Sequence, residues 1–254
     1  MNKRLKQGMI FVQGFLSINL IWLIASLLTD TPVIPNPFRV YQSFSTVLSS
    51  HMLLHVLYSL RRIGAGLALA LVIGVPIGIL LAYSKEINRM LYPLIYFSYP
   101  IPKTALLPIA MLLLGMRDGS KVLIMVLVIV FQVIISVRDS ILTIDKTMYQ
   151  VMKSTGAGKL AIIRHVTLPA ILPQLLTSLR VSLGAAVSIL FFVEGYGTSY
   201  GMGYYILDAW SRINYIEMYL GIITIAIIGY LLFVAIDYLA YRVCKWKPTG
   251  DRNI

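Results

Sequence analysis

One stretch of this chain has the residue types of a phosphate-binding loop but not their spacing. Thr155-Gly156-Ala157-Gly158-Lys159 brings two glycines up to a lysine, the combination that cradles a nucleotide phosphate. Such a loop requires Gly, four residues and then Gly-Lys-Ser/Thr. Here Lys153 stands where the first glycine should be, and Leu160 follows the lysine. The chain is therefore not expected to bind ATP, and any ATP chemistry must come from another chain.

Two charged residues lie in otherwise apolar stretches, where ionisable side chains are functional candidates. Arg180 could line a path for solutes and attract anions, or its long side chain could reach the membrane interface. Glu194 could line the same path, or it could be a solvated acid that begins a glycine-rich loop. Both interpretations stay open for each residue.

The remaining reactive residues form no catalytic or metal-binding pattern. The single cysteine, Cys244, cannot form an intrachain disulfide and lacks the neighbours of a metal site. The histidines are too scattered for a metal centre: His51, His55 and His165. Since no nucleophile is paired with a base, an intramembrane enzyme is disfavoured.

The composition is that of an integral membrane protein. Of 254 residues, 58% are hydrophobic and 13% charged, against about 25% charged in an average globular chain. Mean hydropathy is +0.82. The net charge of +12 would suggest nucleic acid as a partner of a soluble protein, but the basic residues lie between apolar runs, so no nucleic-acid partner is expected.

The first apolar run is too long for a signal peptide and predicts an uncleaved transmembrane helix.

The uncharged runs predict an all-α, polytopic protein that forms one transmembrane domain over residues 1–254. Spans of about 17–25 apolar residues cross a bilayer. The predicted spans are about 9–29, 63–84, 91–115, 121–138, 175–195 and 217–240. Prolines and Lys103 interrupt the third, so we expect it to be broken, with Lys103 facing protein or water. A short helix is expected to run from Val40 into the second span.

Lysine and arginine placement predicts that both termini are cytoplasmic. With six spans, 14 of the 22 basic residues fall in the segments on the side of the termini and six on the other, while Lys103 and Arg180 lie within spans. Positive residues accumulate on the cytoplasmic side. The protein is therefore expected to be a multi-pass protein of the cell membrane, in contact with the lipid bilayer.

The longest inner loop, about 139–174, reads as helix, glycine break, helix and proline. Asp145 can cap the first helix, and both Gly156 and Gly158 can adopt a left-handed turn. Residues 160–166 can form a second helix, after which Pro169 and Pro173 are expected to reset the chain direction. The sequence thus predicts a helical elbow on the inner membrane surface.

This loop resembles the EAA loop of binding-protein-dependent ABC importer permeases. That family's pattern is Glu-Ala-Ala, three residues, Gly, nine residues, Ile, one residue and Leu-Pro. Gly156 stands at the glycine position and Val166 at the isoleucine position, and Leu168-Pro169 completes the pattern. Gln150-Val151-Met152 replaces Glu-Ala-Ala, which puts in doubt a salt bridge from that acid to a partner. The ATPase-coupling residues implied are Gln150, Val151, Met152, Lys153, Gly156, Ala157, Gly158, Val166, Leu168 and Pro169.

Shorter motifs extend the resemblance over nearly the whole chain and point to the nitrate, sulfonate and taurine branch. They are Ile34-Pro35-Asn36-Pro37, His55 with Ser59-Leu60-Arg61-Arg62, Gly74-Val75-Pro76-Ile77-Gly78, Pro100-Ile101-Pro102, and Gly201-Met202-Gly203-Tyr204 after Glu194.

The resemblance implies a transport subunit rather than an enzyme. It implies a homodimer of permeases, two cytoplasmic ABC ATPase subunits that carry ATP and Mg²⁺, and an extracytoplasmic solute-binding protein. No cofactor is implied in this chain. The cargo would be a small nitrate-, sulfonate- or taurine-like anion. The alternatives are a vitamin precursor such as a thiamine pyrimidine, or a secondary transporter that works alone.

Overall fold

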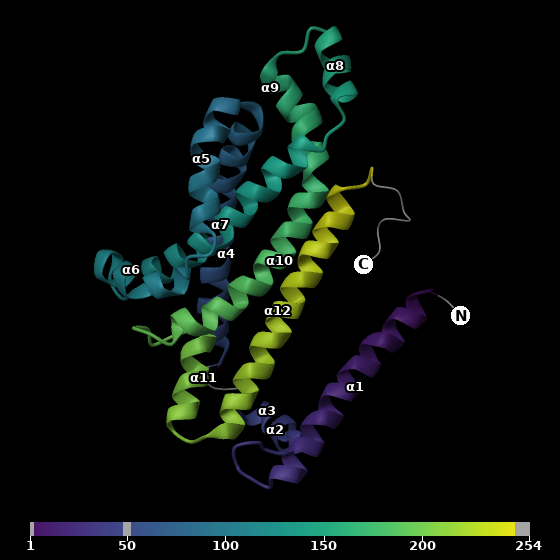
Figure 1. The fold of residues 1–254 in the computed structure, drawn as a ribbon. Helices are drawn as coiled ribbons and strands as arrows, with labels where there is room; N and C mark the ends of the chain where they lie inside the picture. The colour runs from purple at the N-terminus through teal and green to yellow at the C-terminus, as the bar shows by residue number, and fades with distance from the viewer. Residues whose placement is uncertain (1–2, 48–51, 247–254) are drawn as a thin grey trace.

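The computed structural model describes residues 3–47 and 52–246, and all regular structure within them is helical (Figure 1). Five helices are long and apolar enough to cross a membrane. They are α1 (Lys3–Thr29), α4 (Met52–Tyr83), α7 (Asp118–Leu142), α10 (Leu168–Glu194) and α12 (Tyr215–Val243). A bent pair, 85–98 with 103–114, makes a sixth candidate span. The prediction of an all-α protein with about six spans is confirmed.

Shorter helices connect these spans. They are α2 (Pro37–Gln42), α3 (Phe44–Val47), α5 (Lys85–Ser98), α6 (Leu107–Leu114), α8 (Lys146–Ser154), α9 (Lys159–Ile162) and α11 (Met202–Ser211), with a 3₁₀ turn over Lys103–Leu106 and a π turn over Ile163–Thr167.

The core lies where α7 packs between α4 and α10 (Figure 1). One stripe of α7 is fully buried, with Ile129, Val133 and Val137 at intervals of four residues. On the facing side of α4, Gly74 and Gly78 lie directly against Val133 and Val137. The absence of side chains at these two positions lets the helix axes approach closely, which is how helices associate where lipid removes the hydrophobic driving force.

The third span is broken, as the sequence predicts. Its two halves, 85–98 and 103–114, are bent by 88° at a break that contains Pro100 and Pro102. Proline disfavours helix in the residue before it and has no N–H to continue the ladder. The Lys103 ammonium donates to the carbonyl oxygens of Ser98 and Tyr99, the latter at 2.7 Å. Lys103 therefore faces protein rather than lipid, as expected.

The prediction of a helix from Val40 into the second span is wrong. Pro37 opens α2 at a position where its missing N–H is not needed, and Asn36 caps that helix by accepting from the Phe38 N–H at 2.9 Å. The chain leaves α2 at Ser43 and forms the separate helix α3. Residues 48–51, including His51, lie outside the described residues. The second span begins at Met52, eleven residues earlier than the sequence suggests.

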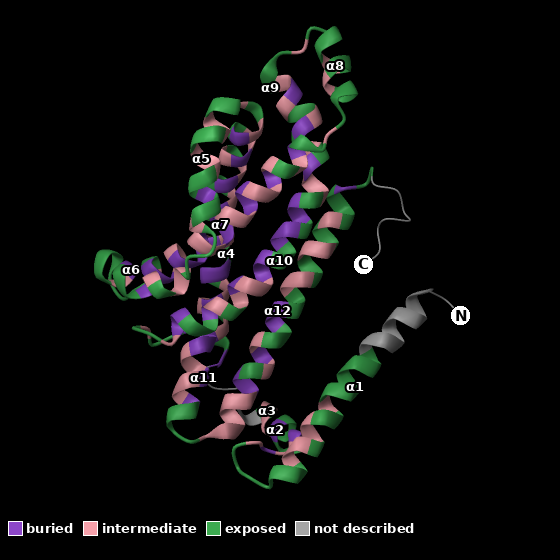
Figure 2. Ribbon diagram, in the orientation of Figure 1, coloured by how far each residue is buried: buried purple, intermediate pink, exposed green. Residues whose placement is uncertain are grey.

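Helix α1 stands away from the rest of the bundle (Figure 1), and Figure 2 shows its described surface as exposed or intermediate along its length. None of the residues in its apolar window, 12–29, is buried. It contacts the other helices through the indole of Trp22, which stacks on the Tyr219 ring of α12 at 5.1 Å, and through Asn19, whose side chain accepts from the Tyr41 hydroxyl of α2 at 2.7 Å. An apolar surface of this extent requires lipid or another protein around it.

The α4–α7 contact gives a stability prediction. A Cβ atom added at Gly78 would lie 2.7 Å from Cβ of Val137, whereas one added at Gly64 of the same helix meets nothing within 4 Å. Gly78→Val is therefore expected to cost about 1–3 kcal/mol of stability through overpacking, and to lower the melting temperature of the detergent-solubilised protein by several degrees. Gly64→Val is the matched control. Equal melting temperatures for the two variants would contradict the close helix contact.

Candidate functional site

A helical elbow, residues 145–167, projects from one end of the bundle, opposite the end that carries α2, α3 and α11 (Figure 1). Its first helix, α8, begins as the sequence predicts: the Asp145 carboxylate accepts from the Thr147 N–H at 2.8 Å. This hydrogen bond from Thr147 lowers the pKa of the Asp145 carboxyl. Asp145 is therefore ionised near neutral pH, and its negative charge lies at the positive end of the α8 dipole.

The turn of the elbow depends on one glycine rather than two. Gly156 has φ +75°, the left-handed conformation that was predicted, and it is exposed, so that a Cβ atom added there would meet no other atom within 4 Å. The same prediction for Gly158 is wrong, because its φ is −71° and it is the ordinary N-cap of α9. A non-glycine residue in a left-handed turn costs roughly 1–2 kcal/mol, so only Gly156 is conformationally required.

The predicted coupling residues divide between the surface of the elbow and its base. On the surface, Gln150, Val151, Lys153, Gly156 and Gly158 are exposed, while Met152 and Ala157 are half-buried. At the base, Val166 and Pro169 are half-buried and Leu168 is exposed. The outer face of the elbow also presents large apolar side chains to the surroundings, with Leu160 79% and Val151 58% exposed.

The prediction that prolines reset the chain direction after the elbow is wrong. Helix α9 continues through the π turn into α10, so that residues 159–194 form one helix. The π turn shifts the ladder by one residue, with the Leu168 N–H bonded to the Ile163 carbonyl. Pro169 then falls in the first turn of α10, where proline is tolerated. The second half of the elbow is therefore continuous with the fifth span.

One tyrosine ties the base of the elbow to the second span. The hydroxyl of Tyr83, the last residue of α4, lies 2.6 Å from Oγ1 of Thr167, which is fully buried. Its ring also meets the ring of Tyr149 on α8 edge to face, with centroids 6.4 Å apart. The elbow thus contacts α4 in addition to continuing into α10.

A buried ion-pair cluster closes the opposite end of the bundle. Arg62 of α4 is 3% exposed, and its guanidinium binds the Glu194 carboxylate at 2.7 Å and the Asp118 carboxylate at 2.7 Å. It also donates to the Tyr200 carbonyl at 2.7 Å and to Thr198 Oγ1 at 3.2 Å. The N–H donors of this α4 side chain are thus shared among α7, α10 and the loop after α10. Arg61 makes a second, more exposed pair with Asp118.

The same carboxylate supplies the missing cap of α11. Gly201, the N-cap residue of this helix, has no side chain to accept its first N–H groups. The Gly203 N–H donates to Glu194 at 2.9 Å, and the Met202 N–H donates to Ser59 Oγ at 2.8 Å. A Cβ on Gly201 would lie 2.6 Å from Nη1 of Arg62, so the glycine pattern here is what allows this approach. Glu194 and Ser59 therefore fix both the end of α10 and the start of α11.

This cluster changes the interpretation of Glu194. The prediction of a solvated acid is wrong, because Glu194 is 0% exposed. Its oxygens are occupied by Arg62, Ser59 and Gly203, so in this conformation it has no surface to offer a passing solute. Glu194 instead belongs to a buried cluster with Arg62, Asp118 and Ser59, named the clamp below, which joins α4, α7 and α10 to the start of α11. Lys121 strengthens the same end, since its buried ammonium donates to the carbonyl oxygens of Met116 and Gly197.

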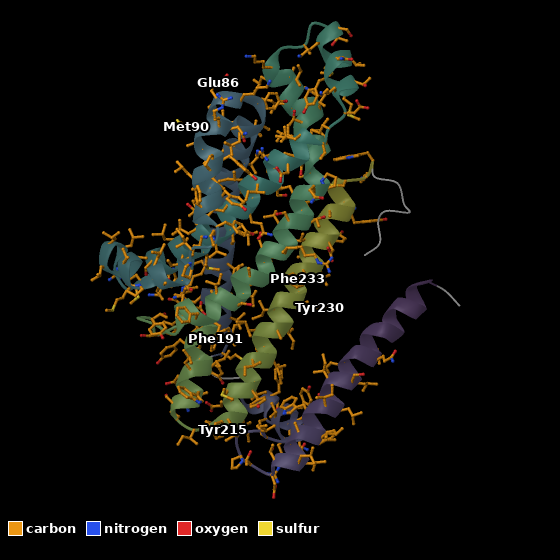
Figure 3. All side chains as sticks on the ribbon, in the orientation of Figure 1. Glu86, Met90, Phe191, Tyr215, Tyr230 and Phe233 are labelled. Carbon is orange, nitrogen blue, oxygen red and sulfur yellow. The ribbon has the colours of Figure 1, made fainter. Side chains whose placement is uncertain are left out.

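Arg180 also has a partner that the sequence did not suggest. Its guanidinium lies 3.2 Å from the Asp237 carboxylate on α12 and over the Phe233 ring at 5.8 Å. Figure 3 labels Phe233 on the stretch of α12 that runs alongside α10. Arg242, five residues after Asp237 in the sequence, contacts the Tyr238 ring instead. The Arg180–Asp237 pair joins α10 to α12.

The sequence held a signal for the clamp that motif matching alone did not use. His55, Ser59 and Arg62 recur at intervals of four and three residues, which places them on one face of α4 inside an otherwise apolar helix. Polar residues on one face of a span must find partners within the protein. His55 does so by accepting from the Gly201 N–H at 3.2 Å.

Comparison with known proteins agrees with this architecture. The family model for "Binding-protein-dependent transport system inner membrane component" matches residues 74–245. The taurine transport system permease protein TauC of Escherichia coli is 29% identical over 232 residues, 89% of this chain and 84% of TauC. The putative aliphatic sulfonates transport permease protein SsuC of Bacillus subtilis is 31% identical over 222 residues, 86% of this chain and 80% of SsuC. The formylaminopyrimidine transport permease protein ThiX of Halalkalibacterium halodurans is 27% identical over 234 residues, 92% of this chain and 94% of ThiX.

Two solved structures share the fold. A chain of the MetNI methionine ABC transporter, in an inward-facing conformation, superposes with a TM-score of 0.66 at 21% identity, covering 76% of this chain and 95% of that one. A chain of a bacterial ABC transporter involved in the import of the acidic polysaccharide alginate superposes with a TM-score of 0.60 at 17% identity, covering 95% and 99% of the two chains.

The clamp predicts that replacing one buried carboxylate oxygen of Glu194 by an amide nitrogen strongly lowers the stability of the folded protein. Glu194→Gln removes the charge but keeps the shape, and leaves Arg62 with Asp118 alone. The expected loss is about 3 kcal/mol, the low end for breaking a buried ion pair, measured as a fall in melting temperature in detergent. The control is Arg212→Gln, which removes more exposed pairs with Asp208 and Glu217 and should cost at most about 1 kcal/mol. Equal effects would show that the buried pair does not hold the helices together.

Proposed function

This chain belongs to the family of binding-protein-dependent transport system inner membrane components, and we propose that it is the membrane-spanning permease subunit of an ATP-driven importer for a small sulfonate- or taurine-like solute. In this proposal ATP is hydrolysed by two separate ABC ATPase subunits, and an extracytoplasmic binding protein delivers the solute. Two copies of this chain form the path between them. The names of the relatives TauC and SsuC support the solute class.

The observation that carries the proposal is the elbow. It is the part of the chain that both matches the EAA-loop spacing and stands clear of the bundle, with Gly156 in the left-handed turn at its tip. Its exposed face combines the apolar side chains of Val151 and Leu160 with Lys153 and Lys159. Apolar surface exposed beside charges at an aqueous end of a protein is typical of a docking site. We propose that this face, residues 146–160, seats in a groove on the ATPase.

The elbow is connected so that docking can move the spans. Helix 159–194 runs without interruption from the elbow to the Arg62–Glu194 clamp, and Tyr83 joins the elbow to α4. Closure of the ATPases would therefore tilt α4 and α10 together. We propose that this tilt alternates access of the path to the two sides of the membrane.

A vitamin precursor is the second candidate cargo. The formylaminopyrimidine permease ThiX matches this chain along almost the full length of both proteins. Its cargo differs from a sulfonate in carrying no fixed negative charge. A secondary transporter that works alone remains disfavoured because the elbow would then have no role.

The orientation follows from the basic residues, and it gives a direct test. We propose that both termini and the elbow are cytoplasmic. In a Cys244→Ala background, single cysteines replace Val33, which is 49% exposed in the loop after α1, and Lys153 on the elbow. A membrane-impermeant maleimide added to intact cells should label the Val33 site only, and permeabilisation should expose the Lys153 site. Labelling at Lys153 in sealed cells would reverse the topology.

The coupling role predicts that Gly156→Asp abolishes transport without preventing membrane insertion. The substitution places a side chain in a left-handed turn, at roughly 1–2 kcal/mol, and buries an unpaired charge when the elbow docks, which costs more. We expect normal amounts of the variant in the membrane. Taurine uptake should fall by at least about 90%, which is a tenfold change in uptake and corresponds to about 1.4 kcal/mol. The ATPase should co-purify less well, or its hydrolysis should be uncoupled from transport.

Gly158→Asp is the matched control for Gly156→Asp. It adds the same charge two residues away at φ −71°, in an N-cap position that favours aspartate. It bears the same cost of a buried charge on docking but not that of a left-handed turn, so it should keep the shape of the elbow and lose less uptake than Gly156→Asp. Wild-type uptake and ATPase binding by Gly156→Asp would mean that the elbow is not the coupling element.

A further inference from the structure

The helix that runs from the elbow into the fifth span contains one turn of a different kind. Over Ile163–Thr167 the backbone forms a π turn, and the Leu168 N–H bonds to the Ile163 carbonyl, five residues back instead of four. π turns are rare, and single ones inside an α-helix are frequently found at functional sites. This one lies at the base of the elbow, between α9 and α10, where movement of the elbow relative to the spans is either transmitted or absorbed.

The sequence leaves the hydrogen-bond ladder of this turn incomplete in either register. In an α ladder, residue 169 donates to the carbonyl of residue 165, and in a π ladder to that of residue 164. Position 169 is a proline, which has no N–H and donates to neither. The α register therefore lacks part of the ladder that ordinarily favours it. Leu168, the residue before this proline, has φ −60° and ψ −47°, a helical conformation that the proline ring disfavours sterically. The backbone of the turn is thus weak by itself, and a contact from elsewhere in the fold can decide its register.

That contact comes from the hydroxyl of Tyr83, the last residue of α4. It lies 2.6 Å from Oγ1 of Thr167, the last residue of the π turn. A threonine hydroxyl inside a helix commonly bonds back to the carbonyl four residues earlier, which here is that of Ile163. Thr167 bonds to Tyr83 instead, and it is 0% exposed, so water does not compete for its oxygen. The hydroxyl that would otherwise bond within the turn is therefore committed to another helix.

Tyr83 is well placed to hold the elbow, because it contacts both halves of it. Directly after Tyr83 the chain passes from α4 into α5, where Ser84 caps α5 by accepting from the Ile87 N–H at 3.3 Å. The Tyr83 ring meets the ring of Tyr149 on α8 edge to face, with centroids 6.4 Å apart. Tyr83 as a whole is 45% exposed, but its hydroxyl meets an enclosed oxygen. One side chain at the junction of α4 and α5 thus contacts the first helix of the elbow through its ring and the base of the second through its hydroxyl.

We propose that Tyr83 is a positioning residue for coupling: its hydroxyl holds the π turn in one register, so that force applied to the elbow reaches both α10 and α4. This rests on the proposed function. Without that hydroxyl, Thr167 would bond back within its own helix, and the turn would yield when the ATPases close. ATP would then be hydrolysed by ATPases that are still docked on residues 146–160, but little solute would move.

The ratio of solute moved to ATP hydrolysed tests this role, because a purely structural defect would lower both together. The complete complex, with the wild-type chain, Tyr83→Phe or Thr167→Val, is reconstituted in liposomes, and taurine uptake and ATP hydrolysis are measured on the same preparation. Each substitution removes one hydroxyl and nearly keeps the size of the side chain. We expect ATPase co-purification and hydrolysis within about twofold of wild type, and uptake per ATP lowered at least about fivefold, in the range expected for the loss of one hydrogen bond.

Three further variants make the result specific. Tyr83→Phe combined with Thr167→Val should lower the ratio no more than either single change, since both remove the same contact. Thr167→Ser keeps the hydroxyl and should retain the wild-type ratio. Tyr92→Phe on α5 is the matched control for Tyr83→Phe. The Tyr92 ring lies under the Arg138 guanidinium at 4.2 Å, but its hydroxyl makes no hydrogen bond with a described residue, so this change should leave the ratio unaltered.

Hydrogen exchange of the detergent-solubilised full chain gives a second readout that does not depend on transport. Local opening of a helix exposes its amides to exchange. Tyr83→Phe should speed exchange of the backbone amides of residues 163–168 about fivefold, and it should leave those in the middle of α10, residues 180–190, unchanged. Tyr92→Phe should affect neither segment.

Three outcomes would overturn the proposal: a wild-type ratio in Tyr83→Phe, additive losses in the double variant, or unchanged exchange at residues 163–168. A wild-type complex without ATP-driven uptake would contradict the proposed function instead. In that case the exchange measurement would still decide whether Tyr83 holds the turn.

Discussion

The buried contact between Arg62 and Glu194 is the constraint on which the arrangement of the spans depends. Apolar side chains do not distinguish a neighbouring helix from lipid, so helix position within a bilayer must be set by close packing and by polar contacts. Here one guanidinium binds two carboxylates from two other helices, and one of those carboxylates, that of Glu194, also caps α11. Removing one partner of a buried ion pair leaves an uncompensated charge and costs about 3–5 kcal/mol, so the four segments must meet in this one geometry.

The two ends of the bundle therefore have opposite character. The clamp end is enclosed, ionic and paired, with Glu194, Arg62 and Lys121 all buried. The elbow end is open, and it exposes apolar and basic side chains together. Between them runs helix 159–194, which at 1.5 Å per residue spans about 54 Å. We propose that this helix, held by the clamp at one end and continuous with the elbow at the other, acts as a lever.

Sequence reasoning reached the features that are local in the chain. Apolar run length located the spans, the prolines located the break at Lys103, and the left-handed turn followed from Gly156. It failed where the outcome depends on distant partners. Whether Glu194 is solvated depends on Arg62, which lies 132 residues away, and the partner of Arg180 is Asp237, 57 residues away. The continuity of α9 and α10 was missed because a π turn has no simple residue pattern.

The contrast between the clamp and the elbow shows how one chain can use polar groups in two ways. In the clamp, each charged side chain is held by fixed partners, which makes the contact strong and specific to one geometry. At the elbow, Lys153 and Lys159 are exposed beside the apolar side chains of Val151 and Leu160. Polar and apolar groups that are exposed together are available to a partner, whereas those of a saturated ion pair are not. Because the fixed contacts lie at one end of helix 159–194 and the available ones at the other, a partner could bind the elbow without breaking the contacts that position the spans.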